Sequence, residues 1–293
     1  MNPLVRARTD IPEDSLDSAI LCMPEGSELR VLNERETSFA HPSAIVDPRA
    51  DIGEGVLVGP YAIIGGRVSL GDGTQVGAHA VVDGPTRVGR RCRIFPSAMV
   101  GLIPQDLKFD GCESSVEIGD DNIIREFVTI HRAARPGGRT VIGDGNLLMA
   151  YVHIAHDCMI GNGTILANCV QLAGHVVIHD QASVGGLTPV HQFVRIGRLA
   201  FVGGGSRVAK DVPPYVRAAG NPLRVVGLNA IGLERRGYSL EAVAEIKRAY
   251  RIVYRSQLNV TQAIERIHAE VTPTPEVRSF TEFLETTERG IEC

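Results

Sequence analysis

An aliphatic residue recurs at every sixth position of this chain from Val46 to Val208. Of the 28 positions in this series, only Asp106, Cys112 and Pro136 are not aliphatic, and glycine directly follows 13 of the others. A helix repeats its apolar residues every three or four positions and a half-exposed strand every two, so neither produces a period of six. A short fixed period of this kind is typical of a parallel β-helix.

Each six-residue unit predicts one short strand with its aliphatic residue facing inward, followed by a turn in which glycine supplies a positive φ angle. Three units close one triangular coil, so each inward residue should stack on the residue 18 positions later. A single coil buries little apolar surface, so stability must come from stacking between neighbouring coils. The repeat resembles that of the hexapeptide-repeat transferases. This resemblance implies a left-handed coil, whereas parallel crossovers are otherwise nearly always right-handed.

The repeat divides the chain. Residues 1–40 lack it and are interpreted as an N-terminal extension, with a short strand expected around Leu29–Leu32. Residues 41–222 form the predicted β-helix, interrupted by loops at 102–115 and 132–139 that leave the period intact. Insertions on a rigid scaffold often carry function, so both loops are candidates for a site.

Residues 223–293 change to helical spacing and predict a small α-helical C-terminal domain. Ser239, then Asn259 or Thr261, and then Pro275 mark the expected starts of three helices. The first of these should carry an apolar stripe made of Leu240, Val243, Ile246, Tyr250 and Val253. We expect the helical domain to cover the open end of the coil, whose strand edge would otherwise invite pairing.

The amino-acid composition limits which classes of function this chain can have. Tryptophan is absent and aromatic residues make up 5 % of the 293 residues, which fits a core of thin aliphatic layers. The net charge of −4 and the lack of a basic run give no reason to expect nucleic-acid binding. No stretch approaches the ~20 apolar residues of a membrane span, and the N-terminus lacks a secretory apolar region. The six cysteines form no CxxC pair, which favours a reducing, cytoplasmic location.

Positive charge is concentrated late in the chain. Between Arg195 and Arg255 there are 12 basic and 4 acidic residues, an excess of 12 − 4 = 8. Such an excess attracts an acidic partner or a phosphate-bearing ligand, although it is also compatible with a merely solvated face.

Five of the nine histidines lie between residues 153 and 191: His153, His156, His175, His179 and His191. His153 and His156 flank the inward Ile154, so both are expected to point outward. His175 follows His156 by one coil plus one residue, which predicts that the two are neighbours at one corner. A cluster of outward imidazoles favours a general base with polar supporters, and Asp157 is placed to orient His156.

Zinc is the main alternative for this cluster. Three histidines on a β-helix also form the metal site of the gamma-class carbonic anhydrases, which the repeat resembles equally well. His153, His156 and His175, with Cys158 two residues after His156, offer the required ligand types. Those enzymes do not account for the helical C-terminal domain or for the loop that carries Asp106 and Lys108.

Eight further motifs, taken in order, resemble those of the acyl-ACP–UDP-N-acetylglucosamine O-acyltransferase family, whose reaction opens lipid A biosynthesis. The resemblance covers residues 41–293 and is specific because all motifs keep the same order. The motifs are Gln105–Lys108, Val128–Arg132, Asn146–Met149, His153–Cys158, Leu172–His175, Val190–Phe193, Asp211–Tyr215 and Leu233–Gly237.

This resemblance implies a homotrimer, with sites between neighbouring prisms and neither a metal nor a redox cofactor. It implies that His156 is the general base, that Asp157 supports it, and that the Gly174 backbone N–H stabilises the oxyanion. It also implies that acyl carrier protein delivers the acyl chain and that UDP-N-acetylglucosamine receives it. The implied contacts to substrate or carrier are Asp106, Lys108, His153, His175, His191, Gln192, Gly204, Asn229, Arg235 and Arg236.

The chain departs from the family pattern at a few points. Ile231 stands where an acidic nucleotide contact is common, and Gly204, at the position that limits acyl length, implies room for a long chain beside the bulky Phe201. A 3-amino sugar acceptor needs little change in these motifs. The related N-acyltransferase of the same pathway differs in its flanking domains. A non-catalytic paralogue that only binds a sugar nucleotide is also compatible with the repeat, although an intact His156–Asp157 pair argues against it.

Overall fold

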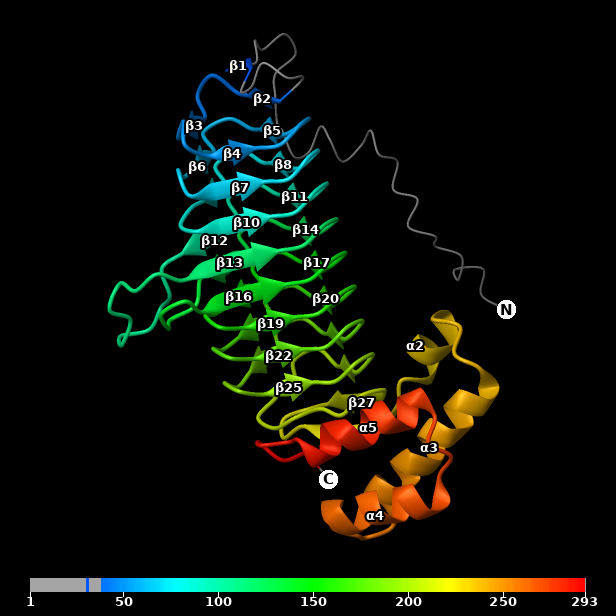
Figure 1. Cartoon of the computed structure of the whole chain (residues 1–293). Coiled ribbons are helices and arrows are strands. Elements are labelled where there is room, and N and C mark those ends of the chain that lie inside the picture. The colour runs from blue at the N-terminus through cyan, green and yellow to red at the C-terminus, as the bar shows by residue number, and fades with distance from the viewer. Residues whose placement is uncertain (1–29, 32–37, 293) are drawn as a thin grey trace.

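The fold is a three-sided prism of stacked coils with a helical domain at its C-terminal end (Figure 1). The computed structural model of the chain describes residues 30–31 and 38–292. The prism has three sheets, which the chain visits in turn, and neighbouring coils pair in parallel. The antiparallel pairs among the described residues are β1 with β2 and β27 with β28.

The first sheet has 12 strands. They are β1 (Arg30–Val31), β2 (Phe39–Ala40), β5 (Leu57–Val58), β8 (Gln75–Val76), β11 (Arg93–Ile94), β14 (Ile123–Ile124), β17 (Leu147–Leu148), β20 (Ile165–Leu166), β23 (Ser183–Val184), β26 (Phe201–Val202), β27 (Val216–Ala219) and β28 (Arg224–Leu228).

The second and third sheets have 8 strands each. The second contains β3 (Ile45–Val46), β6 (Ile63–Ile64), β9 (Val81–Val82), β12 (Met99–Leu102), β15 (Thr129–His131), β18 (His153–Ile154), β21 (Gln171–Leu172) and β24 (Pro189–Val190). The third contains β4 (Asp51–Ile52), β7 (Val68–Leu70), β10 (Thr86–Val88), β13 (Ser115–Ile118), β16 (Arg139–Ile142), β19 (Met159–Ile160), β22 (Val177–Ile178) and β25 (Arg195–Ile196).

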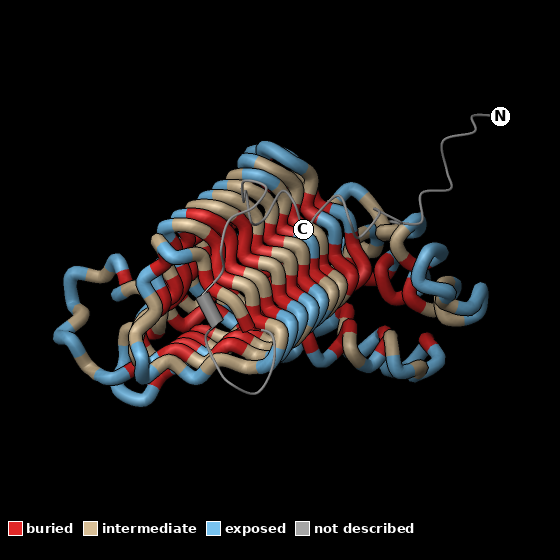
Figure 2. The backbone as a smooth tube through the Cα atoms, turned by 90° about the horizontal axis from the view of Figure 1, so that it is seen from above, coloured by how far each residue is buried: buried red, intermediate tan, exposed pale blue. Residues whose placement is uncertain are grey.

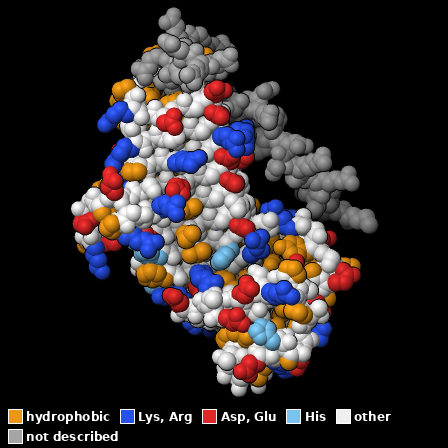
Figure 3. All heavy atoms as spheres, in the orientation of Figure 1, with side chains coloured by type: hydrophobic (Ala, Val, Ile, Leu, Met, Phe, Trp, Pro, Cys, Tyr) orange, Lys and Arg blue, Asp and Glu red, His pale blue; other side chains and the backbone are white. Residues whose placement is uncertain are grey.

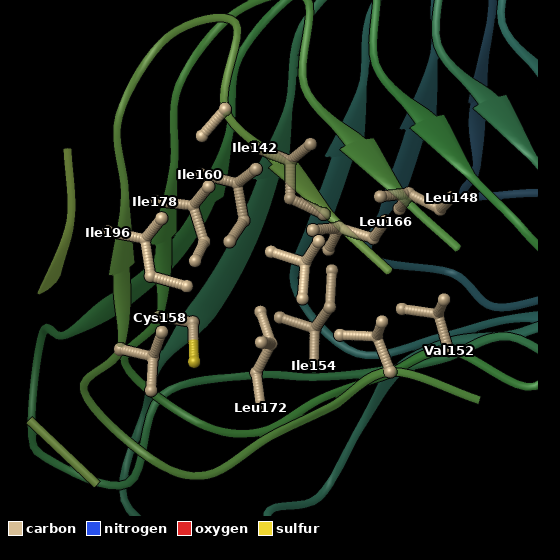
Figure 4. Packing of buried hydrophobic residues seen from close by; sticks show 14 of the residues in the cluster. Ile142, Leu148, Val152, Ile154, Cys158, Ile160, Leu166, Leu172, Ile178 and Ile196 are labelled. Carbon is tan, nitrogen blue, oxygen red and sulfur yellow. The ribbon is translucent and has the colours of Figure 1, made fainter. Parts of the chain in front are cut away.

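The inward aliphatic positions form the core as the repeat predicts. Ile154 pairs with Leu172, 18 residues later, and both side chains are fully buried. Figure 4 shows such residues stacked in files, one file for each sheet. Figure 2 shows the same order as continuous bands of buried and exposed residues along the stack. The parallel β-helix is therefore confirmed, while its left hand remains a prediction from the resemblance.

The two insertions leave the prism without shifting its register. Thr86 pairs with Val116, an offset of 30 residues, and Ser115 pairs with Arg139, an offset of 24. These offsets exceed 18 by two units and one unit of the repeat, respectively, so every later strand stays in phase. Both loops project from the same side of the prism (Figure 1).

The expected positive φ is found at glycines of the turns, and at Gly101 after the inward Val100, but not at every glycine that follows an inward position. Gly53 and Gly71 are not among the residues with positive φ, whereas Gly55 and Gly73, two positions later, are. A Cβ on Gly71 would lie 2.6 Å from the carbonyl carbon of Gly89 in the next coil. Glycine is needed there because the two backbones approach closely, and not because of the turn conformation.

The helices are α2 (Ala230–Arg235), α3 (Leu240–Arg255), α4 (Val260–Glu270) and α5 (Pro275–Glu285). Ser239, Asn259 and Thr274 cap α3, α4 and α5, and Pro275 occupies the first turn of α5. Leu240 does not join the apolar stripe of α3, because it is 85 % exposed at the first helical position. The short helix α2 was not predicted from the sequence.

The C-terminal segment is fastened to the last coils. Arg195 of β25 lies 4.3 Å over the Phe283 ring and donates to the Thr286 carbonyl at 2.7 Å. The Thr287 hydroxyl donates to the buried Asp211 carboxylate at 2.7 Å. These contacts hold α5 against the end of the prism. None of the helices in the described residues is long and apolar enough to cross a membrane.

Candidate active site

The corner that follows the second sheet collects side chains from successive coils. His156 follows β18, His175 follows β21 and Phe193 follows β24. The rings of His156 and His175 meet edge to face with centroids 5.2 Å apart, and His175 stacks on Phe193 at 4.7 Å. The regular stacking of the coils therefore builds an aromatic column, as the spacing of the two histidines predicts.

His156 and Asp157 form a hydrogen-bonded pair within this column. The His156 Nδ1 lies 2.9 Å from the Asp157 Oδ2, and the imidazole side chain is only 12 % exposed. Because an ionised carboxylate accepts and does not donate, this contact places the proton on Nδ1 of the neutral ring. The lone pair of Nε2 is then available to take a proton, and this atom lies 4.0 Å from the Asp106 Oδ2.

The second insertion fixes the Asp157 carboxylate. The Ala134 N–H donates to its Oδ2 at 3.0 Å, and the Arg135 Nε lies 3.3 Å from its Oδ1. Burial alone raises the pKa of Asp157, but the Ala134 N–H, the His156 ring and the nearby His175 outweigh it, so the pKa is lowered. Asp157 is therefore a stable anion beside the imidazole.

His153 lies one strand position before the inward Ile154. Its Nδ1 is 2.8 Å from the Thr129 Oγ1, and its ring meets His131 edge to face at 5.3 Å. Burial, reinforced by His131 and His156, lowers the pKa of His153 to about 4. Its side chain is therefore neutral near pH 7 and acts as a polar contact, not as a cation.

His175 has a lowered pKa as well, mainly because of its burial, and His156 adds to the effect. Its Nε2 lies 3.9 Å from the Asp157 Oδ2, too far for a hydrogen bond. Its neutral ring supports His156 by packing, and one edge remains partly exposed at the corner.

Gly174 lets the His156 ring lie directly against the backbone. A Cβ at this position would lie 2.5 Å from the His156 Cε1, so no larger residue fits without moving the ring. Among the described residues, no hydrogen bond takes up the Gly174 N–H. This backbone donor and the His156 imidazole are thus held side by side.

The first insertion brings Asp106 to the same corner. The Asp106 Oδ1 accepts from the Lys108 backbone N–H at 2.9 Å, which makes a tight local turn, and the Lys108 side chain is exposed. Between them, Leu107 is fully exposed at the tip of the projecting loop. One coil beyond His175, His191 and Gln192 lie at the same corner, with the His191 Nδ1 3.0 Å from the Gln192 carbonyl oxygen.

The other predicted residues lie elsewhere on the chain. Gly204 follows β26 and lies at the corner between the first and second sheets. Asn229, Arg235 and Arg236 line a cavity of about 490 Å³ between the first sheet and α2. One copy of the chain does not bring these groups onto the corner that carries His156.

That cavity has a mixed apolar and basic lining. Ile165, Phe201 and Arg217 of the first sheet line it together with Arg235 and Arg236. The Asn229 amide is already engaged, because its Oδ1 accepts from the Gly232 N–H at 3.1 Å and its Nδ2 donates to the Leu199 carbonyl at 3.0 Å. Asn229 therefore caps α2 in addition to lining the cavity. Ile231 is 57 % exposed there and adds apolar surface.

The proposed zinc ligands are only partly assembled. Among the described residues, one group could hold a metal ion, formed by His156, Asp157 and His175 with ligand atoms within 4.8 Å of one another. His153 is not in that group, and Cys158 is fully buried with its pKa raised to about 12 by burial. The three-histidine set of the carbonic anhydrases is thus not formed by the part of the chain that the structure describes.

Four contacts were not foreseen from the sequence. The Ala134 N–H and Arg135 anchor Asp157, and Thr140 accepts from the Asp157 N–H at 2.9 Å. Thr129 engages His153. The pairing of β15 with β18 implies the last contact, since Thr129 stands opposite His153 in the ladder. The path of the second insertion follows no repeat and offered no such signal.

The stacked coils and the corner site define a hexapeptide-repeat transferase: the model of the bacterial transferase hexapeptide (six repeats) matches residues 49–84 and 139–174. The model named Udp N-acetylglucosamine O-acyltransferase, domain 2, matches residues 211–292. The chain belongs to the UDP-N-acetylglucosamine O-acyltransferase family, as the relatives below demonstrate.

The chain is 48 % identical over 252 residues to an acyl-[acyl-carrier-protein]–UDP-N-acetylglucosamine O-acyltransferase from Myxococcus xanthus, covering 86 % of this chain and 98 % of the relative. A protein of the same name from Synechocystis is 51 % identical over 198 residues, covering 68 % of this chain and 71 % of the relative. A solved UDP-N-acetylglucosamine acyltransferase from Bacteroides fragilis superposes with a TM-score of 0.84 at 45 % identity, covering 86 % of this chain and 99 % of that one.

Proposed function

We propose that this chain transfers a 3-hydroxyacyl group from acyl carrier protein to the 3-hydroxyl of UDP-N-acetylglucosamine, in lipid A biosynthesis. The single observation that carries the mechanism is the buried His156–Asp157 pair, which leaves the His156 Nε2 free and faces Asp106. Family membership supplies the reaction class, and this pair supplies a base of the right kind in the right setting.

In the proposed step, the His156 Nε2 takes the proton of the sugar 3-hydroxyl. The oxygen attacks the thioester carbonyl carbon, and the carbonyl electrons move onto its oxygen. The Gly174 N–H donates to this oxyanion, an interaction of the kind that is typically worth ~3 kcal/mol. When the tetrahedral intermediate collapses, the carbon–sulfur bond breaks, and His156 returns its proton to the departing pantetheine thiolate. Asp157 stabilises the transient imidazolium.

The remaining residues are assigned to binding. Asp106, Lys108, His153, His175, His191 and Gln192 contact the sugar nucleotide. The neutral state of His153 suits a hydrogen bond to a sugar hydroxyl better than an ion pair with a phosphate. Gly204 limits the acyl chain. Arg235 and Arg236, together with Asn229, hold the nucleotide phosphates or the carrier's pantetheine in the basic cavity.

The proposed assembly is a homotrimer, supported by the separation of these groups. His156 lies at one corner of the prism, whereas Gly204 and the basic cavity belong to the other corner of the second sheet and to the first sheet. A substrate that contacts all of them must bridge two copies. The proposal includes no metal and no cofactor other than the donor's phosphopantetheine, and it places the enzyme in the cytoplasm.

Charge supports acyl carrier protein as an acidic partner. The excess of positive charge from Arg195 to Arg255 adjoins the basic cavity. On the face of the prism seen in Figure 3, by contrast, Lys and Arg side chains are interspersed with Asp and Glu. An acidic carrier is therefore steered toward the C-terminal end.

The test is a radiolabelled transfer assay with purified protein, UDP-N-acetylglucosamine and a panel of 3-hydroxyacyl carrier proteins, run with and without a chelator. Chelator-insensitive product is the expected result, and the panel reports the chain length. A parallel assay with the 3-amino sugar nucleotide distinguishes the acceptor. Absence of product with every donor and both acceptors would refute the proposal, and loss of product with chelator would refute its metal-free mechanism.

A further inference from the structure

The Asp157 carboxylate is satisfied on one oxygen only. Its Oδ2 accepts from the His156 ring and from the Ala134 N–H. Its Oδ1 is buried and has no hydrogen-bond partner among the described residues, and the Arg135 Nε is the cation near it, at 3.3 Å. A buried carboxylate oxygen without a hydrogen-bond partner is costly, so a cation beside it helps to hold this group in place.

We propose that Arg135 is a positioning residue of the acyl transfer, which acts on His156 through Asp157. This inference rests on the proposed function. Its guanidinium holds the carboxylate in the orientation that receives the His156 Nδ1–H, and its charge offsets that of Asp157. No feature of the repeat assigns a role to Arg135, because it lies in the second insertion.

The second insertion is held firmly enough for this role. The Gly137 N–H donates to the Glu113 carbonyl at 2.8 Å, and the Ser115 N–H donates to the Gly138 carbonyl at 3.1 Å. On the other side of Arg135, the Ala134 carbonyl lies 3.6 Å from the Cys112 Sγ. The two insertions thus clamp each other, and the backbone on both sides of Arg135 is anchored.

The charges around His156 determine which protonation state of its ring would be favoured by the loss of Arg135. Asp157 and Asp106 face the ring with negative charge, while His175 and His153 are neutral near pH 7. Arg135 is the positive group paired with this set. Without it, the two carboxylates act on the ring unopposed and favour the protonated imidazole. A protonated His156 cannot accept the proton of the sugar hydroxyl.

The experiment compares Arg135→Gln, Arg135→Lys and the control Arg139→Gln in transfer kinetics from pH 5.5 to 9. Arg139 ends the same insertion but pairs with Glu117, at 3.0 Å, on the third sheet. For Arg135→Gln we expect kcat near neutral pH to fall roughly three- to tenfold, with the acid limb of the profile about half a pH unit higher. The effect is modest because the Arg135 side chain is 73 % exposed.

Arg135→Lys keeps the charge and should restore the position of the acid limb, while Arg139→Gln should match the wild type. KM values for both substrates should stay unchanged in Arg135→Gln, and its Tm should remain close to that of the wild type. An unmoved acid limb would overturn the proposal, and so would a raised KM with wild-type kcat, which would make Arg135 a substrate contact. If the wild type itself makes no product, the proposed function fails instead, so the two failures are distinguishable.

Discussion

Replacing Gly174 with alanine tests whether the position of the His156 ring governs the reaction. The three atoms nearest to a Cβ at this position all belong to His156, the closest at 2.5 Å. Ordinary van der Waals contact begins at about 3.4 Å, so the ring must retreat by about 1 Å. A displacement of that size at a catalytic group costs roughly 100-fold in rate. Because a side chain gives way and the backbone does not, we expect little change in stability.

Gly161→Ala is a matched control at the corner that follows the third sheet. Its Cβ would lie 2.4 Å from the Asp180 Oδ1 and 2.6 Å from the Asp180 backbone nitrogen, so the backbone itself must shift. Such overpacking typically costs about 1–3 kcal/mol, which lowers Tm by several degrees.

The measurement is kcat from transfer assays together with Tm from thermal denaturation, for both variants. We expect Gly174→Ala to have a lower kcat than the wild type and an unchanged Tm. Gly161→Ala should have a lower Tm and an unchanged kcat. If Gly174→Ala retains kcat within threefold of the wild type, the ring position does not limit the reaction. If the Tm of Gly174→Ala falls as that of the control does, the variant is destabilised, and the argument from the position of the His156 ring fails.

Three further changes have expected outcomes. Gly204→Met, whose Cβ would lie 3.2 Å from the Gly186 carbonyl oxygen and 3.5 Å from the Gly186 nitrogen, should shift the donor preference toward shorter acyl chains in the panel assay. Reversing Arg235 and Arg236 to Glu should raise KM for the nucleotide or the carrier, measured by steady-state kinetics. His153 favours its neutral form in the fold, with a pKa of about 4 against 6.5 unfolded, so its contribution to stability is lost as pH falls through this window. His153→Gln should therefore flatten Tm against pH between 6.5 and 4.

The sequence predicts the prism almost completely because its register is set by the repeat. Each inward residue stacks on the one 18 positions later, and the lengths of the two insertions preserve that phase. The start of α3 at Ser239 followed from capping chemistry in the same direct way. The helix α2 escaped prediction because its six residues are too few to show a helical period.

The glycines illustrate a limit of local reasoning. Conformational freedom is the usual reason for glycine in a turn, and it predicts positive φ after each inward position. The positive φ occurs two residues later instead, where Tyr61, Phe127 and Asp157 adopt it without being glycine. The glycines after the inward position answer a contact between coils, which depends on a neighbour about 18 residues away and not on the local turn.

The site shows the same division between regular and irregular parts. His156, Gly174 and His175 belong to the repeat, so their neighbourhood follows from counting residues. Ala134 and Arg135 lie in an insertion whose path depends on hydrogen bonds to the other insertion, and no period places them. The proposed base and the proposed oxyanion donor are thus fixed by the scaffold, whereas the anchor of Asp157 comes from residues 132–138. We therefore expect substitutions of the exposed Arg135 to adjust the reactivity of His156 without disturbing the coils of the core.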